Sequence, residues 1–395
     1  MSMAEPAPVR TRIAALDVLR GVAILGTFGT NVWLFATPGG ALDWLSGGLT
    51  ARDPVEAGLR LLSNGKFLAL LTLLFGVGIE LQYRSAVRRR AHWPGRYPLR
   101  ALILFAEGLV HYLLVFEFDV LMGYALASLV VAYLVGRSER AVRRWMWTVG
   151  TVYVVLLLAL TGLLLLAPDA SASPDPVDPG ATVSWTAQVA ARLQYFLLFR
   201  IELVVIVPSA VVLFLAGSRL RRAGAFEDGE AGVRLRKRLM ITGFGVALPL
   251  NALTTFGGED WFLVDRYLLP PVVALGLLGL VTTLVLRSRP EPGPVRRGVA
   301  AVGRTALSCY VLQNVLASVL CYGWGLGLAA RLADARPWWV VGLWAGVSAV
   351  LLVAASLWLR RFDRGPLEML MHRLYEPRRA PVAVGPGRPN ASQVK

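Results

Sequence analysis

Polar side chains inside apolar stretches are the part of this sequence best suited to chemistry. An ionisable group inside a membrane is costly and usually faces the interior of a helix bundle. His111 is the only histidine in such a stretch, and Glu107 precedes it by four residues, on the same helical face. A carboxylate beside an imidazole fixes its tautomer and raises its basicity. The pattern therefore predicts His111 as a general base that Glu107 orients.

Further polar candidates lie near the same depth, about 10 Å below the outer membrane surface at roughly 1.5 Å per helical residue. With His111 they are Asn31, Lys66, Arg200 and Glu202, together with Asp119 at the end of the helix of His111 and Gln313 in a later apolar stretch. We expect these side chains to bind substrate in one cavity that opens outward. Lys66 or Arg200 would stabilise an oxyanion or bind acidic substrate groups.

Each of these residues also has a purely structural interpretation. A buried histidine can bond a backbone carbonyl or a neighbouring helix, and an intramembrane Lys66 can snorkel to the interface. A mid-helix Gln313 is more often a contact between helices than a catalytic group. The sequence leaves these alternatives open.

A second set of charged residues begins two apolar stretches on the inner side. Arg20 and Arg304 would clamp a phosphate-bearing donor such as an acyl-CoA, and the alternative is a pair of interfacial anchors. The two cysteines and three histidines show no metal-ligand spacing. We therefore expect no metal and no tightly bound cofactor, and leave an acyl-CoA-type donor open.

The elements that carry these residues are long apolar segments. Hydrophobic residues make up 56% of the 395, far more than a soluble protein of this length carries. The sequence predicts an all-α integral membrane protein with about ten transmembrane helices, each near the 20 residues that cross a bilayer. The predicted spans are 17–37, 60–84, 98–117, 119–136, 146–167, 194–218, 239–257, 268–286, 303–325 and 337–359.

The net charge of +16 follows the positive-inside rule, because the basic stretches occur after every even-numbered span. Both termini are therefore predicted to be cytoplasmic in a multi-pass protein of the cell membrane. The predicted parts are a cytoplasmic segment 1–16, a transmembrane domain 17–359, an interfacial amphipathic helix 360–376 and a disordered basic tail 377–395. The expected partners are the lipid bilayer and a small-molecule substrate, without nucleic acid; a homo-oligomer stays open.

Five blocks of sequence in a fixed order resemble the YeiB family of bacterial multi-pass membrane proteins of unknown function. The blocks are LDVLRGVAILG at 16–26, GKF at 65–67 with LFGVG at 74–78, GLVH at 108–111 with DVL at 119–121, GRTALSCYVLQ at 303–313 with YG at 322–323, and WLRRF at 358–362 with GPLE at 365–368. That family is distantly similar to transmembrane acyltransferases, which include heparan-alpha-glucosaminide N-acetyltransferase. Many of the O-acyltransferases have a histidine at the position of Asn31, so the resemblance implies that His111 would take its place.

The leading functional prediction is an acyltransferase that moves an acyl group from a cytosolic donor to an extracytoplasmic acceptor. The alternative is a small-molecule transporter or exporter that uses the same intramembrane polar residues as its path. A third reading is a scaffold or sensor without enzymatic activity.

Overall fold

The computed structural model describes residues 14–375 except 49–50, 52, 167–181 and 290. Every regular element in this part of the chain is helical, which confirms the predicted all-α class. Most of the predicted segment 1–16 and the predicted tail 377–395 lie outside the described residues.

Eight helical segments of the described chain are long and apolar enough to cross a membrane, which indicates an integral membrane protein. They are α1 (Ala14–Phe35), α3 with α4 (Pro54–Ser63 and Lys66–Arg88), α5 (Tyr97–Leu114), α7 (Glu139–Leu166), α9 with α10 (Phe196–Arg200 and Leu203–Arg222), α11 with α12 (Glu230–Met240 and Leu248–Phe256), α13 (Pro270–Arg287) and α17 (Trp338–Trp358). The other two predicted spans correspond to shorter apolar helices, α6 (Leu121–Leu134) and α15 (Ala306–Cys321).

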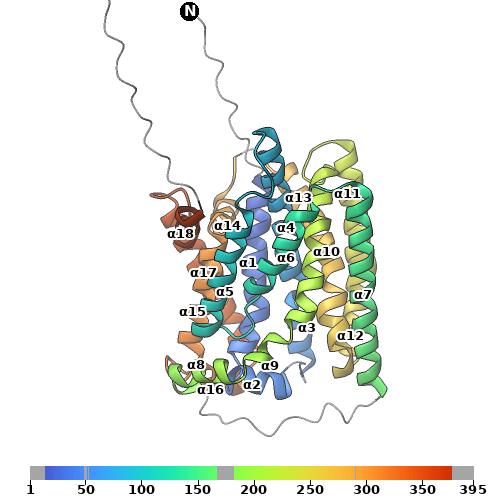
Figure 1. The fold of residues 1–395 in the computed structure, drawn as a ribbon. Helices are drawn as coiled ribbons and strands as arrows, with labels where there is room; N and C mark the ends of the chain where they lie inside the picture. The colour runs from blue at the N-terminus through green and yellow to red at the C-terminus, as the bar shows by residue number, and fades with distance from the viewer. Residues whose placement is uncertain (1–13, 49–50, 52, 167–181, 290, 376–395) are drawn as a thin grey trace, which may run out of the picture.

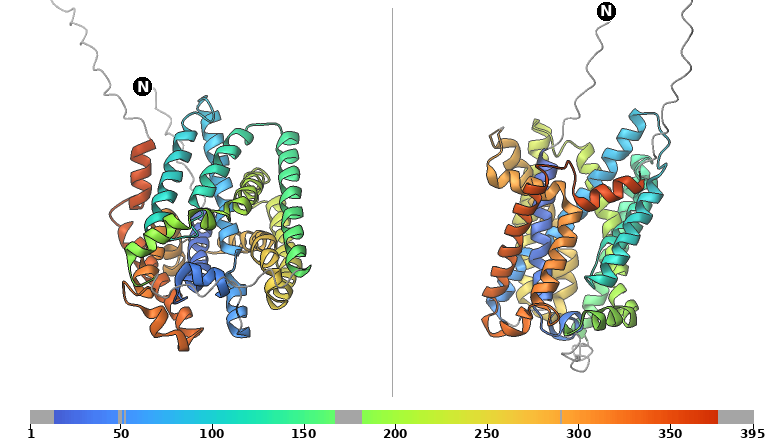
Figure 2. Two further views of the ribbon diagram at one scale, coloured as in Figure 1. Left: turned by 60° about the horizontal axis from the view of Figure 1, so that its bottom comes forward. Right: turned by 90° about the vertical axis from the view of Figure 1, so that its left-hand side faces the viewer.

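The helices run between two ends of an elongated bundle (Figures 1 and 2). At one end lie α11, α14 (Pro294–Arg304) and α18 (Pro366–Tyr375), and we refer to it as the α18 end. The opposite end carries α2 (Gly40–Asp43), α8 (Trp185–Gln194) and α16 (Leu328–Arg331), and is the α8 end. The chain enters α1 at the α18 end and crosses to the α8 end (Figure 1). Helices α4 and α10 both begin at the α8 end.

Three predicted continuous spans are broken in the structure, and the one expected at 194–218 is interrupted on either side of α9. The span expected at 60–84 is divided between α3 and α4 by Gly65, whose φ of 68° is left-handed. The span expected at 303–325 is divided between α14 and α15 at Thr305. Hydropathy identified the apolar stretches, but it carries no information about a turn of one or two residues within them.

Glycines allow the central helices to approach at backbone distance. A Cβ on Gly303 would lie 1.8 Å from the carbonyl oxygen of Asp17, and one on Gly21 would lie 1.9 Å from that of Val299. These contacts pack α14 directly against α1. Gly217 of α10 approaches the carbonyl oxygen of Leu73 on α4 in the same way, at 2.0 Å from a Cβ placed there.

The C-terminal helix α18 caps another helix of the bundle. Glu368 accepts hydrogen bonds from the backbone N–H groups of Leu307 (2.8 Å) and Ser308 (3.4 Å) and from the Ser308 hydroxyl. These groups begin α15, whose first N–H groups have no partner within the helix. Of the segment 360–376 predicted as an interfacial helix, Pro366–Tyr375 is helical, and it packs against α5 and α15 at the α18 end.

Candidate functional site

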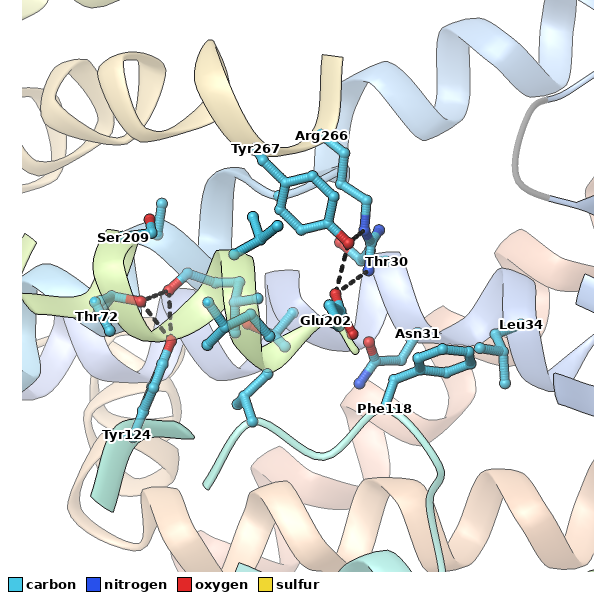
Figure 3. Close-up of a pocket in the computed structure, with 18 of the residues that line it drawn as sticks. Thr30, Asn31, Leu34, Thr72, Phe118, Tyr124, Glu202, Ser209, Arg266 and Tyr267 are labelled. Carbon is cyan, nitrogen blue, oxygen red and sulfur yellow. Dashed lines mark hydrogen bonds and ion pairs between the residues drawn. The ribbon is translucent and has the colours of Figure 1, made fainter. Parts of the chain in front are cut away.

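A cavity of about 300 Å³ lies between α1, α4, α6 and α10 on the side toward the α8 end (Figure 3). Most of its wall is apolar. At the α8 end the wall includes Leu198 and Ile201, whose side chains are 46% and 68% exposed on the outside of the bundle. This volume is that of a small-molecule site and exceeds the space that a single water molecule needs.

Polar groups gather at one end of the cavity. The Tyr267 hydroxyl donates to Glu202 at 2.6 Å, and Arg266 lies 4.0 Å from the same carboxylate. Burial and the Glu202 charge raise the pKa of Tyr267, so its phenol stays protonated and acts as the donor. Asn31 and Thr30 of α1 also line this end, as Figure 3 shows. The arrangement suits a ligand that carries a hydroxyl or an amine.

The loop that supplies Arg266 and Tyr267 is fixed by Asp265. Its carboxylate accepts from Asn64 at 2.7 Å and from Asn251 at 2.7 Å. Arg266 returns a bond to the Asn64 side-chain oxygen at 2.9 Å. The left-handed Gly65 is required here, because a Cβ would lie 2.4 Å from the Arg266 carbonyl oxygen. The Asn64-to-Lys66 turn therefore positions the polar end of the cavity.

A second polar group lies deeper in the wall. Thr72 is six residues into α4, and its hydroxyl bonds Tyr124 of α6 and the Leu68 carbonyl oxygen. Ser209 of α10 lines the cavity nearby (Figure 3). Apolar wall separates these hydroxyls from Glu202, so a ligand that fills the cavity meets polar groups at both ends.

His111 belongs to a buried network next to the cavity. Its Nδ1 lies 2.7 Å from an Asp119 carboxylate oxygen, and its Nε2 lies 3.4 Å from the Asn314 amide nitrogen. The same Asp119 oxygen accepts from Tyr310 at 3.4 Å. Tyr310 lines the cavity, whereas His111 is 3% exposed and lies behind it and Phe116. The network connects the cavity wall to the imidazole through Asp119.

Two buried arginines hold the α5–α6 loop that carries Asp119. Arg192 of α8 pairs with Glu117 at 2.9 Å and donates to the carbonyl oxygens of Leu113 and Val115, both at 3.1 Å. Arg200 donates to the carbonyl oxygens of Glu117 and Asp119. The loop thus keeps its shape through side chains from α8 and α9, and it presents Phe116, Phe118 and Val120 to the cavity.

The predicted site residues fall into three groups. Asn31 and Glu202 line the cavity. Asp119, His111 and Arg200 form the layer behind its wall, and Lys66 is buried beside the Asn64 carbonyl oxygen, near Asp265. The prediction that Glu107 orients His111 is wrong, because Asp119 occupies Nδ1. Four residues of helix place Glu107 on the right face, but the loop after α5 brings a closer carboxylate.

The remaining predicted residues lie away from the cavity wall. Arg20 pairs with Asp17 at 3.8 Å, and Arg304 donates to the Asp363 carbonyl oxygen, both at the α18 end. Gln313 is fully buried in α15, and neither of its side-chain polar atoms has a protein partner. Fully buried Leu19 and Leu73 belong to one apolar cluster between α1 and α4. Within the described residues, no group of His, Cys, Asp and Glu side chains could hold a metal ion.

Sequence reasoning missed four residues of the site. They are Arg192, Arg266, Tyr267 and Tyr310. Tyr310 belongs to the block GRTALSCYVLQ at 303–313 and lies one helical turn before Asn314. That spacing could have identified it. The Arg266–Tyr267 pair lies in a segment that reads as an interfacial loop, so only tertiary packing reveals it.

The amino-acid sequence of the chain is similar to a family model and to two bacterial proteins. Residues 220–377 match the model for a protein of unknown function, DUF418, and this match ends just after α18. The chain is 28% identical to the uncharacterized protein YeiB of Escherichia coli (strain K12), over 92% of this chain and 96% of that one. It is 26% identical to the uncharacterized protein YxaH of Bacillus subtilis (strain 168), over 94% and 96%. No solved structure matches the chain.

The resemblance inferred from the sequence blocks is therefore confirmed. The chain is homologous to YeiB and YxaH over most of its length.

Proposed function

We propose that this protein is a membrane-embedded acyltransferase that acts on a hydroxyl or amine acceptor. The observation that carries the proposal is the contact of Tyr310, on the cavity wall, with the buried Asp119–His111 pair. A histidine that is hydrogen-bonded to a carboxylate is a common proton acceptor in catalysis. Acyl transfer to a hydroxyl or amine needs such an acceptor beside the substrate.

We further propose that the α18 end faces the cytoplasm and that ten helices cross the membrane. The loops at the α18 end carry the basic stretches at 84–100, 219–238 and 287–297, as the positive-inside rule requires of a cytoplasmic face. The segment with Glu259 and Asp260 lies toward the other end, beside α12. The cavity is then in the outer half of the bilayer and within reach of an extracytoplasmic acceptor.

The proposed reaction moves one acyl group and one proton. The acceptor hydroxyl binds at Glu202 and Asn31, and its oxygen attacks the donor carbonyl carbon. A new C–O bond forms and the bond to the leaving group, a thiolate for a thioester donor, breaks. The acceptor proton passes to Tyr310 as Tyr310 gives its own proton to the Asp119–His111 pair.

The size of the cavity bears on the group that is transferred. A pocket of about 300 Å³ suits a short acyl group together with the reacting part of the acceptor. The donor approaches from the α18 end in this proposal, so the packed helices around Leu19 and Leu73 must separate for its acyl end to reach the cavity.

Inverted membrane vesicles that contain the protein provide the test. The vesicles are supplied with radiolabelled acetyl-CoA, and labelled lipids, glycans and proteins of the lumen are separated and counted. We expect lumenal label from the wild type and its loss in Tyr310→Phe and His111→Gln. Glu139→Gln, a carboxylate variant on the other side of the bundle, should retain it. Equal labelling in protein-free control vesicles or in all variants would refute the proposal, and uptake of an unmodified solute would favour transport.

A further inference from the structure

A seam of polar side chains follows the contact between α5 and α15. Tyr310, Asn314 and Ser318 recur every four residues, so they lie along one face of α15. Tyr310 and Asn314 contact the Asp119–His111 pair, and Ser318 reaches the Val115 carbonyl oxygen at 3.5 Å. Helices that meet only through packing have small or apolar residues at such a line. This contact is polar over at least two turns.

Glu107 extends the seam toward the α18 end. It precedes His111 by one turn of α5, and the charges of Asp119 and Glu368 both act on its carboxylate. One of its oxygens is completely buried and has no hydrogen-bond partner in the protein. Asn314 likewise has a buried side-chain oxygen without a partner. Buried polar atoms that serve only as contacts between helices are normally paired, and these two oxygens are not.

Glu368 completes the seam at the α18 end. Its carboxylate bonds Ser308 at the start of α15, and the residue is partly exposed. The groups between the cavity and this end therefore follow one order: Tyr310, Asp119 with His111, Glu107 and Glu368. Buried polar atoms without a protein partner are the sites that internal water usually occupies, and water bridges the gaps between such groups.

We infer that the α5–α15 seam is a proton path between the cavity and the α18 end. Glu107 is its central carrier, taking a proton from the Asp119–His111 pair and passing it toward Glu368. Chains of carboxylates and histidines in membrane proteins serve this purpose. The path goes beyond the proposed acyl transfer, because proton movement along it needs neither donor nor acceptor. In the proposed reaction it would return the acceptor proton to a thiolate that leaves at the cytoplasmic face.

Proton flux into proteoliposomes tests the inference directly. The purified full chain is reconstituted with an entrapped pH-sensitive dye, and a potassium gradient with valinomycin supplies the driving force. We expect wild-type vesicles to acidify faster than protein-free vesicles. Glu107→Gln keeps the size of the side chain but removes the titratable group, so its flux should fall to the protein-free rate. Glu107→Asp keeps the carboxyl group and should retain flux.

Two controls make the outcome decisive. Glu139→Gln removes a half-exposed carboxylate that pairs with Arg219 and Arg222 outside the seam, and its flux should equal that of the wild type. Elution volume and thermal midpoint of Glu107→Gln establish that it is folded. Wild-type flux no faster than that of empty vesicles, or undiminished flux in folded Glu107→Gln, would overturn the inference. Neither result bears on acyl transfer, which is measured separately with labelled donor.

Discussion

Replacement of Arg192 by methionine should destabilise the protein through its partner Glu117. The arginine side chain is 1% exposed and that of Glu117 is 6% exposed, so the pair is shielded from water. Arg192→Met leaves the carboxylate buried without its counter-charge and removes donors from the carbonyl oxygens of Leu113 and Val115. Breaking a buried ion pair by removing one partner costs about 3–5 kcal/mol.

This free energy converts into a measurable change in melting temperature. An unfolding entropy of about 2.1 cal/mol/K per residue amounts to about 0.8 kcal/mol per degree for this chain, so the Tm should fall by about 4–6 °C. The twelve tryptophans provide the fluorescence signal for thermal unfolding in detergent. Arg234→Met is the matched control, since its ion pair with Glu230 is exposed on both sides and contributes little.

The double variant Arg192→Met with Glu117→Leu separates charge burial from loss of packing. An apolar pair of similar size is often as stable as a buried ion pair, so at least half of the lost Tm should return. A single variant whose Tm stays within about one degree of the wild-type Tm would refute the stabilising role of the Arg192–Glu117 pair. A double variant no more stable than the single one would show that the carbonyl contacts, and not the charge, decide stability.

Three other experiments with substituted proteins have definite expected outcomes. Gly303→Val should prevent the close approach of α14 to α1, because a Cβ there lies 1.8 Å from a carbonyl oxygen. The yield of monodisperse protein should therefore fall. Gly342→Val is the control, and it should leave the yield unchanged because the space around Gly342 is open. Gly65→Ala should lower the thermal midpoint by about 1–3 °C from its left-handed φ alone, and further through the clash with the next loop. In a cysteine-free background, Asp334→Cys should react with a membrane-impermeant maleimide in intact cells, and Ser288→Cys only after permeabilisation; the reverse pattern would contradict the proposed orientation.

The fold was largely predictable because apolar length is a local property of the sequence. Each predicted span overlaps one or two of the observed apolar helices, and the helix expected near residue 366 begins at Pro366. The breaks at Gly65 and Thr305 were not predictable from hydropathy. They depend on contacts with residues far along the chain, such as the loop at Arg266 and the carboxylate of Glu368.

The site was predictable in part, since burial of polar groups is visible in the sequence but pairing is not. Depth along each helix selected Asn31 and Glu202, which line the cavity, and His111, which lies behind its wall. The same reasoning gave Glu107 as the partner of His111, because helical spacing was the only distance available. Asp119 replaces it through the fold of a loop that arginines of α8 and α9 hold in place.

The cap that Glu368 provides has a consequence for biosynthesis. The N–H groups that it satisfies belong to residue 307 and its neighbour, and the ribosome makes them 61 residues before the carboxylate that binds them. During that interval the first turn of α15 lacks its final partners, and the polar seam that begins there is incomplete. A chain truncated just before α18 should therefore insert all of its apolar helices yet never close this part of the bundle.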